Sequence, residues 1–181
     1  MKSRTKGKSK GMAFLFSIKF FGLMFVTGRL VAYISWTYEL VKNWAIPTEP
    51  FFAKVTVLHS SNALTVEGYL AFAIAYIVAF GLVILGMLQL EKSTRLCTDT
   101  SLFQEKIGHA FKKAGISFLI FAFVTFWLDT FYLFFESTSS RTLDLLSTEL
   151  LVFTILGFLL LFLSDVFKEG ITIREENELT I

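Results

Sequence analysis

The sequence predicts an all-α membrane protein, a bundle of four transmembrane helices with a cytoplasmic amphipathic helix and a short C-terminal tail. Two observations lead to this fold class. The chain is 54% hydrophobic, with a mean hydropathy of +0.64, whereas soluble domains average roughly 45–50% apolar residues. The apolar residues also gather in four runs, and each run is long enough to cross about 30 Å of hydrocarbon, which takes about 20 residues.

Polar segments separate the four runs and set the expected topology. The expected spans are about residues 12–36, 68–90, 115–135 and 149–167, with an external loop at 37–67, a cytoplasmic loop at 91–114 and a tail at 168–181. A soluble helical bundle is the alternative, but four runs that are apolar all round exceed what a small core can bury. The first run is also too long for a cleaved signal peptide, and it contains Arg29.

Basic residues predict the orientation, because short cytoplasmic loops carry an excess of Lys and Arg. Twelve of the 17 basic residues lie in the two tails and the middle loop, and three lie in the two other loops. We therefore expect a multi-pass protein with both termini in the cytoplasm. Trp36 and Tyr38, at the outer end of the first span, are typical of the aromatic belt at a membrane interface.

The external loop contains the two prolines of the chain, Pro47 and Pro50, which should end an extension of the first helix. After them, residues 54–58 and 64–66 flank the polar residues 60–62. This pattern is compatible with a short hairpin. An irregular cap over the bundle remains an equal alternative.

The cytoplasmic loop has the pattern of an amphipathic helix. Ser101 and Gln104 have the spacing of a capping box. Apolar residues then recur at four-residue intervals, and basic residues fall largely elsewhere on the helical wheel. The apolar residues are Phe103, Ile107 and Phe111, and the basic residues are Lys112 and Lys113. We expect the helix to lie on the inner leaflet and to bend into the third span, with docking of a partner protein as the alternative.

The C-terminal tail follows Gly170, a residue type that often ends helices. A short charged tail is ordinarily disordered, yet apolar residues recur in this one. Together with the loop helix it is the candidate surface for a cytoplasmic partner. The tail residues of this surface are Glu175, Glu176, Glu178, Leu179, Thr180 and Ile181.

Charged residues fall inside the expected spans, where a charge costs about 2.5–3.5 kcal/mol on insertion scales and so usually has a partner. Arg29 and Asp129 lie in the outer halves of the first and third spans and are candidates for an ion pair. Alternatively, Arg29 reaches the interface and Asp129 bonds to hydroxyl groups. Lys19 and Asp165 lie near the inner surface, where they either pair or reach water.

The sequence contains no motif of a known catalytic or metal site. HExxH, CxxC, GxSxG and a phosphate-binding glycine loop are absent. The chain has one cysteine, Cys97, and its two histidines, His59 and His109, fall on opposite sides of the membrane. We therefore expect no enzyme activity, no cofactor, no metal and no direct binding of nucleic acid.

Two stretches resemble a bacterial membrane family, the domain of unknown function 2975. Residues 165–170 and 175–181 are similar to its closing signature: an aromatic residue, a glycine two or three places on, an acidic pair and a terminal Leu-Thr-Ile or Leu-Thr-Val. The segment from Ser101 through Ile107 to Gly115 resembles the region before the family's third span. The four-span layout agrees as well.

The resemblance implies a protein of the bacterial inner membrane whose family has no established activity. Its members are often encoded beside a small helix-turn-helix regulator, which implies a membrane sensor or anchor that holds a cytoplasmic protein. The charges inside the spans favour a different function, that of a small transporter, channel or immunity-type protein. A homo-oligomer is compatible with either function.

Overall fold

The computed structural model describes residues 2–43, 54–57, 66–99, 105–135, 141–144 and 148–179. These residues form four long helices and two short strands: α1 (Lys2–Asn43), β1 (Lys54–Val57), α2 (Val66–Asp99), α3 (Glu105–Phe135), β2 (Arg141–Asp144) and α4 (Thr148–Leu179). All four helices of this described part are long and apolar enough to cross a membrane. The expected helical architecture, with four helices that have the length and composition of membrane spans, is therefore confirmed.

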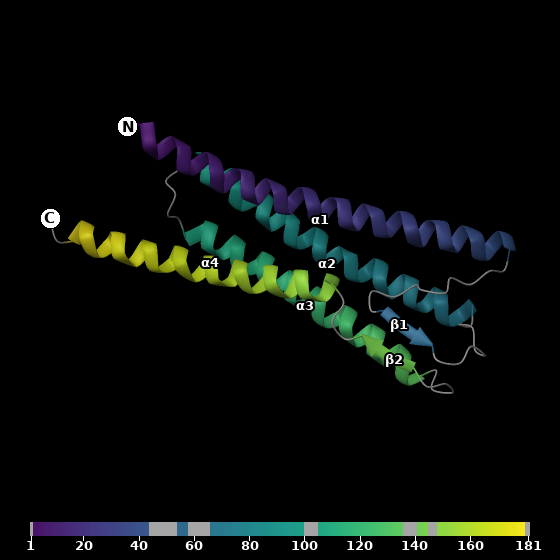
Figure 1. The fold of residues 1–181 in the computed structure, drawn as a ribbon. Helices are drawn as coiled ribbons and strands as arrows, with labels where there is room; N and C mark the ends of the chain where they lie inside the picture. The colour runs from purple at the N-terminus through teal and green to yellow at the C-terminus, as the bar shows by residue number, and fades with distance from the viewer. Residues whose placement is uncertain are drawn as a thin grey trace.

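Both termini lie at one end of the bundle, together with the end of α2 and the start of α3 (Figure 1). We call this the terminal end, and the opposite end, where β1 and β2 lie, the sheet end. α4 begins nearer the middle of the bundle than its neighbours and runs past the start of α3 at the terminal end (Figure 1). The helices are therefore staggered along the bundle axis.

The helices pack in chain order. α1 packs on α2, α2 on α3, and α3 on α4. Among the described residues, no Cα atom of α1 lies within 8 Å of one in α4. The bundle is therefore open along one side, between its first and last helices.

Aromatic rings from all four helices form the centre of the core. Phe25, Phe80, Phe121 and Phe153 come from α1 to α4 in turn, and their ring centroids lie between 4.7 Å (Phe121 and Phe153) and 6.4 Å (Phe25 and Phe80) apart. The rings are tilted or perpendicular to one another, the arrangements that aromatic pairs prefer. We call these four residues the phenylalanine layer.

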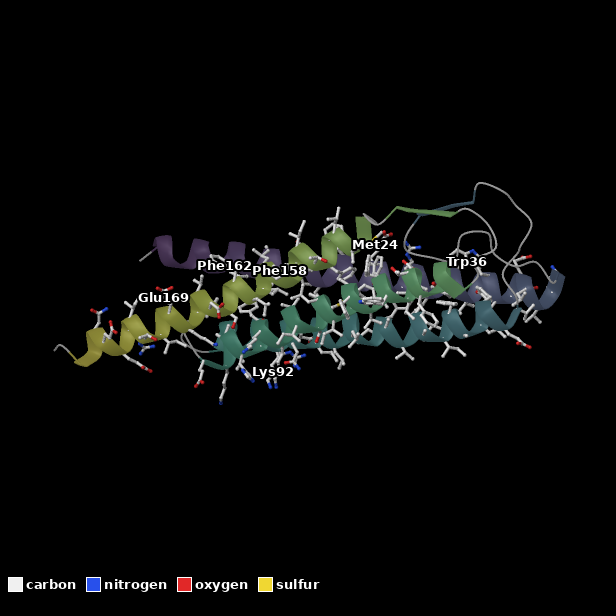
Figure 2. The ribbon with its side chains drawn as sticks, turned by 90° about the horizontal axis from the view of Figure 1, so that it is seen from below. Met24, Trp36, Lys92, Phe158, Phe162 and Glu169 are labelled. Atoms are coloured by element: carbon white, nitrogen blue, oxygen red, sulfur yellow. The ribbon has the colours of Figure 1, made fainter. Side chains whose placement is uncertain are left out.

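Large apolar side chains also cover the outside of the bundle. Met24, Phe158 and Phe162 project from its surface and are more than half exposed (Figure 2). An exposed apolar surface over this whole length of helix is costly in water. It is the surface that lipid requires, and it agrees with the four membrane spans.

Two glycines let α3 and α4 approach closely. A Cβ atom on Gly115 would lie 2.8 Å from the carbonyl oxygen of Gly157, and one on Gly157 would lie 3.1 Å from the carbonyl oxygen of Gly115. Small residues allow such backbone contact between membrane helices. In α2, a Cβ atom on Gly86 would lie 2.5 Å from the ring of Phe118, whereas one on Gly81 would meet nothing within 4 Å.

The segment before the third span does not form a separate helix on the lipid surface. α3 is continuous from Glu105 to Phe135, and Ile107 and Phe111 are buried, with exposed fractions of 0% and 2%. The ring of Phe111 lies 5.4 Å from that of Phe167 in α4. The apolar stripe packs inside the bundle because α4 is long enough to cover it.

The tail also differs from expectation, because α4 continues through Gly170 to Leu179. An interior glycine costs a helix about 1 kcal/mol, and the long run of helix on both sides offsets that cost. Glu175 and Glu176 are exposed on this extension. Phe103, Thr180 and Ile181 lie outside the described residues, and of Glu178 and Leu179 only the backbone is described.

The strand in the first loop pairs with a segment far along the chain, and of residues 64–66, its expected hairpin partner, only Val66 lies within the described residues. β1 pairs antiparallel with β2, with Lys54 opposite Asp144 and Val57 opposite Arg141. Val66 instead begins α2. The sheet thus ties the loop after α1 to the connection between α3 and α4, while Pro47 and Pro50 lie outside the described residues.

Candidate functional site

An ion network at the terminal end joins α1 to α2. The Nζ atom of Lys19 lies 2.7 Å from Oε2 of Glu91, and Nη2 of Arg95 lies 2.7 Å from Oε1 of the same carboxylate. Lys19 therefore pairs with Glu91 and not with Asp165, which is exposed on α4. The physical reason is packing, because α1 lies against α2 and its backbone stays away from that of α4.

The spacing of Glu91 and Arg95 could have predicted this network if the second helix had been expected to continue beyond residue 90. Glu91 and Arg95 were assigned to a loop, because the second span was expected to end at residue 90. α2 in fact continues to Asp99. In a continued helix the two residues are four apart and so lie on one face.

A second ion pair crosses from α1 to α4. Arg29 donates a hydrogen bond from Nη2 to Oε1 of Glu149, and the two side chains are 27% and 26% exposed. Glu149 lies in the first turn of α4, where the helix dipole favours a carboxylate. The guanidinium group of Arg29 also lies 5.8 Å from the ring centroid of Phe25, within the range of a cation–π contact.

Asp129 is buried in the same region, with an exposed fraction of 4%. Asp129 and Arg29 both lie within electrostatic reach of the Tyr33 hydroxyl group. The structure therefore brings the two sequence-predicted residues to the same layer of the bundle. The partner that sequence reasoning missed is Glu149, and a direct pair between Arg29 and Asp129 stays a prediction.

Three buried tyrosines pack together beside these charges, and Tyr33 is the one within their electrostatic reach. The rings of Tyr33 and Tyr76 stack with centroids 5.8 Å apart. The hydroxyl group of Tyr69 donates to the carbonyl oxygen of Tyr33 at 3.5 Å and lies 3.2 Å from the hydroxyl oxygen of Thr37. We call this group the polar cluster, and it consists of Arg29, Tyr33, Tyr69, Tyr76, Asp129 and Glu149.

The phenylalanine layer separates the polar cluster from the Lys19–Glu91 pair. Along α1, Phe25 lies between Lys19 and Arg29, which are about 15 Å apart at the helical rise of 1.5 Å per residue. Packed aromatic rings therefore lie in the described core between the two charged layers, together with aliphatic residues such as Val83. This arrangement isolates each set of charges at its own depth.

An apolar groove of about 680 Å³ occupies the open side of the bundle between α1 and α4. Phe21 and Phe25 line it from α1, and Val152 and Leu156 line it from α4. Glu149 also lines the groove, so the Arg29–Glu149 pair borders an apolar space. A lipid chain or an apolar ligand in the groove would lie beside this ion pair.

The candidate partner surface is divided by the structure. Lys112 and Lys113 are exposed on α3, and Glu175 and Glu176 are exposed on α4. Ile107 and Phe111 are buried between helices and are not accessible to a partner. Among the described residues, no group of three His, Cys, Asp or Glu side chains is placed to hold a metal ion.

Comparison with known proteins identifies the family. A family model described as Protein of unknown function (DUF2975) matches residues 29–181, which include Arg29 and all of α2, α3 and α4. No curated protein and no solved structure matches the chain. The match covers most of the 181 residues and agrees with the closing signature in the C-terminal segment. The chain therefore belongs to the DUF2975 family of proteins of unknown function.

Proposed function

We propose that this protein is a non-enzymatic membrane sensor or anchor that binds a cytoplasmic protein. The polar cluster and the apolar groove would respond to a signal, and the terminal end of α4 would hold the partner. The observation that carries the proposal is the continuity of α4. One helix runs from Glu149, in the polar cluster, to the exposed acidic residues Glu175 and Glu176.

The packing of α4 supports coupling between its two ends. Glu149 joins the first turn of α4 to α1 across the open side of the bundle. A ligand that competes for Arg29 or Glu149 would release this turn. Packed helices shift by about 1–2 Å in many switching proteins, and a continuous helix carries such a shift to its far end, about 39 Å away at Glu175.

The excess of basic residues supports placing the terminal end in the cytoplasm. There, Glu169 is exposed on α4 (Figure 2), and so are Glu175 and Glu176. An acidic helix complements a basic protein surface. The helix-turn-helix regulator that the family resemblance implies would carry such a surface, because nucleic-acid-binding proteins have basic faces. The membrane protein would thus hold the regulator without touching DNA.

Binding of the regulator to full-length protein in nanodiscs tests the partner surface. We expect deletion of residues 171–181, or the pair Glu175→Lys and Glu176→Lys, to lower regulator retention at least about tenfold, because close charge pairs across an interface couple by roughly 1.5 kcal/mol or more. The matched control is Glu39→Lys with Glu67→Lys, which reverses two exposed acids at the sheet end. Equal retention by all variants would sink the proposal.

The sensor function needs a separate measurement, because an anchor requires only the binding surface. Glu149→Gln leaves the α4 extension intact and removes the charge that joins α4 to α1. We expect this variant to change the affinity for the partner, although residue 149 is remote from the binding surface. An unchanged affinity for the partner would be compatible with an anchor function and would reject the sensor function.

Burial of Asp129 favours a second candidate function, a small transporter or channel. Ionisable residues inside a membrane span often mark the pathway of an ion or substrate, and Asp129 is 4% exposed. Ion flux into proteoliposomes tests this function. A loss of flux in Asp129→Asn, with normal flux after deletion of residues 171–181, would favour transport over partner binding.

A further inference from the structure

A second cavity lies at the terminal end, between α2 and α3. Its volume is about 360 Å³. Three lysines line it, Lys92 from α2 and Lys106 and Lys113 from α3, with His109 on the same wall. Figure 2 shows Lys92 at the edge of the bundle. The cavity lies between α2 and α3, apart from the polar cluster and the groove.

The charge of this cavity is unbalanced. Among the described residues that line it, Glu105 is the one acid and Gln89 is neutral, so the three lysines exceed the acids in this set by two charges. All three lysines are exposed, and none of them forms an ion pair with another described residue. The lining therefore offers several donors and an excess of positive charge to an anion.

On α2 and on α3, the helix face that carries the cavity lysines continues toward the membrane centre with exposed apolar residues, which we call the apolar stripes. On a helix, residues three, four and seven apart share a face. On α2, Leu88 and Leu85 precede Lys92 by four and seven residues. On α3, Ile116 and Ile120 follow Lys113 by three and seven residues. The stripe residues are 40–54% exposed, and they are Leu85, Leu88, Ile116 and Ile120.

We propose that this cavity binds the phosphate-containing headgroup of an anionic phospholipid, from the leaflet at the terminal end. Basic pockets between transmembrane helices are suited to anionic headgroups. The lysines would hold the phosphate, and the apolar stripes would hold the two acyl chains. These stripes favour a lipid over free phosphate, because burial of chain methylene groups adds to the affinity. The lipid would bridge α2 and α3, and its binding would not require a bound cytoplasmic protein.

Lipid binding by the purified full-length protein tests the proposal. Native mass spectrometry would measure retention of phosphatidylglycerol and phosphatidylcholine, and a parallel titration would use inorganic phosphate alone. The cavity variant is Lys92→Gln with Lys106→Gln and Lys113→Gln. The matched control is Lys112→Gln with Lys168→Gln and Arg174→Gln, which removes three exposed charges of the terminal end that do not line the cavity.

We expect the wild-type protein and the matched control to prefer phosphatidylglycerol over phosphatidylcholine. The cavity variant should lose this preference, by roughly fivefold in affinity for each lysine removed. Equal losses in the two triple variants would overturn the proposal, because the attraction would then be diffuse. Displacement of the lipid by inorganic phosphate would also overturn it, in favour of a free-anion site.

Single substitutions keep the test decisive if the triple variant does not fold. Lys92→Gln and Lys113→Gln change one wall each and should each weaken phosphatidylglycerol binding about fivefold. Lys112→Gln, beside Lys113 on α3 but outside the cavity lining, should leave it unchanged. Equal affinities in all three single variants would reject the site.

Discussion

At the scale of single residues, Glu149 combines two roles that depend on its position. It is in the first turn of α4, where a carboxylate interacts favourably with the helix dipole. It also accepts a hydrogen bond from Arg29 beside the apolar groove. Removal of either partner would leave the other charge in a region poor in water. The pair should therefore be coupled energetically.

Glu149→Gln should lower the free energy of unfolding by about 1–3 kcal/mol, below the 3–5 kcal/mol of a fully buried pair, because both side chains are about a quarter exposed. Arg29→Gln should have a similar effect. Unfolding in detergent micelles would measure both, and the double variant should be more stable than the sum of the single effects predicts. Strict additivity would show that the two charges do not interact.

At the scale of elements, the contact between α3 and α4 depends on glycine. A Cβ atom on Gly115 would lie 2.8 Å from the carbonyl oxygen of Gly157, and one on Gly157 would lie 3.1 Å from that of Gly115. By contrast, a Cβ atom on Gly28 or Gly81 would meet nothing within 4 Å. The same substitution should therefore have opposite effects at these two kinds of position.

Gly115→Ala should destabilise the protein by about 1–3 kcal/mol, because the methyl group must push two backbones apart. Gly81→Ala should be neutral or stabilising by up to about 1 kcal/mol, because alanine is the better helix former and has space there. Titration with a denaturing detergent would compare the two variants. Equal stabilities would show that the backbones of α3 and α4 are not in contact.

At the scale of the whole molecule, charge is distributed unevenly between the two ends. The N-terminal segment of α1, the end of α2, the start of α3 and the last turns of α4 all meet at the terminal end (Figure 1). These segments hold most of the Lys and Arg residues of the chain. Because basic residues are retained on the cytoplasmic side, this asymmetry predicts the orientation of the whole bundle.

Single cysteines introduced into a Cys97→Ser background would test the orientation. A membrane-impermeant maleimide should label Glu67→Cys in intact cells, because this position is exposed at the sheet end. Glu176→Cys, at the terminal end, should react only after the membrane is opened. The reverse pattern would place the termini outside, and the α4 extension could not then bind a cytoplasmic protein.

Four long apolar helices and a resemblance to the DUF2975 family could both be predicted from the sequence alone. Span length and apolarity are local properties, since each run must cover the same hydrocarbon thickness whatever its neighbours do. The depths of Lys19 and Arg29 followed from the helical rise for the same reason. The closing signature of the family, near the C-terminus, could likewise be recognised from the sequence without the structure.

The tertiary structure alone decided which groups meet. Glu91 and Glu149 became the partners of Lys19 and Arg29 because α2 extends beyond its apolar run and α4 starts level with Arg29. The open groove, the β1–β2 pairing and the burial of Ile107 and Phe111 likewise depend on how the helices are staggered and rotated. Stagger and rotation result from packing between distant segments, so the composition of any one segment does not specify them.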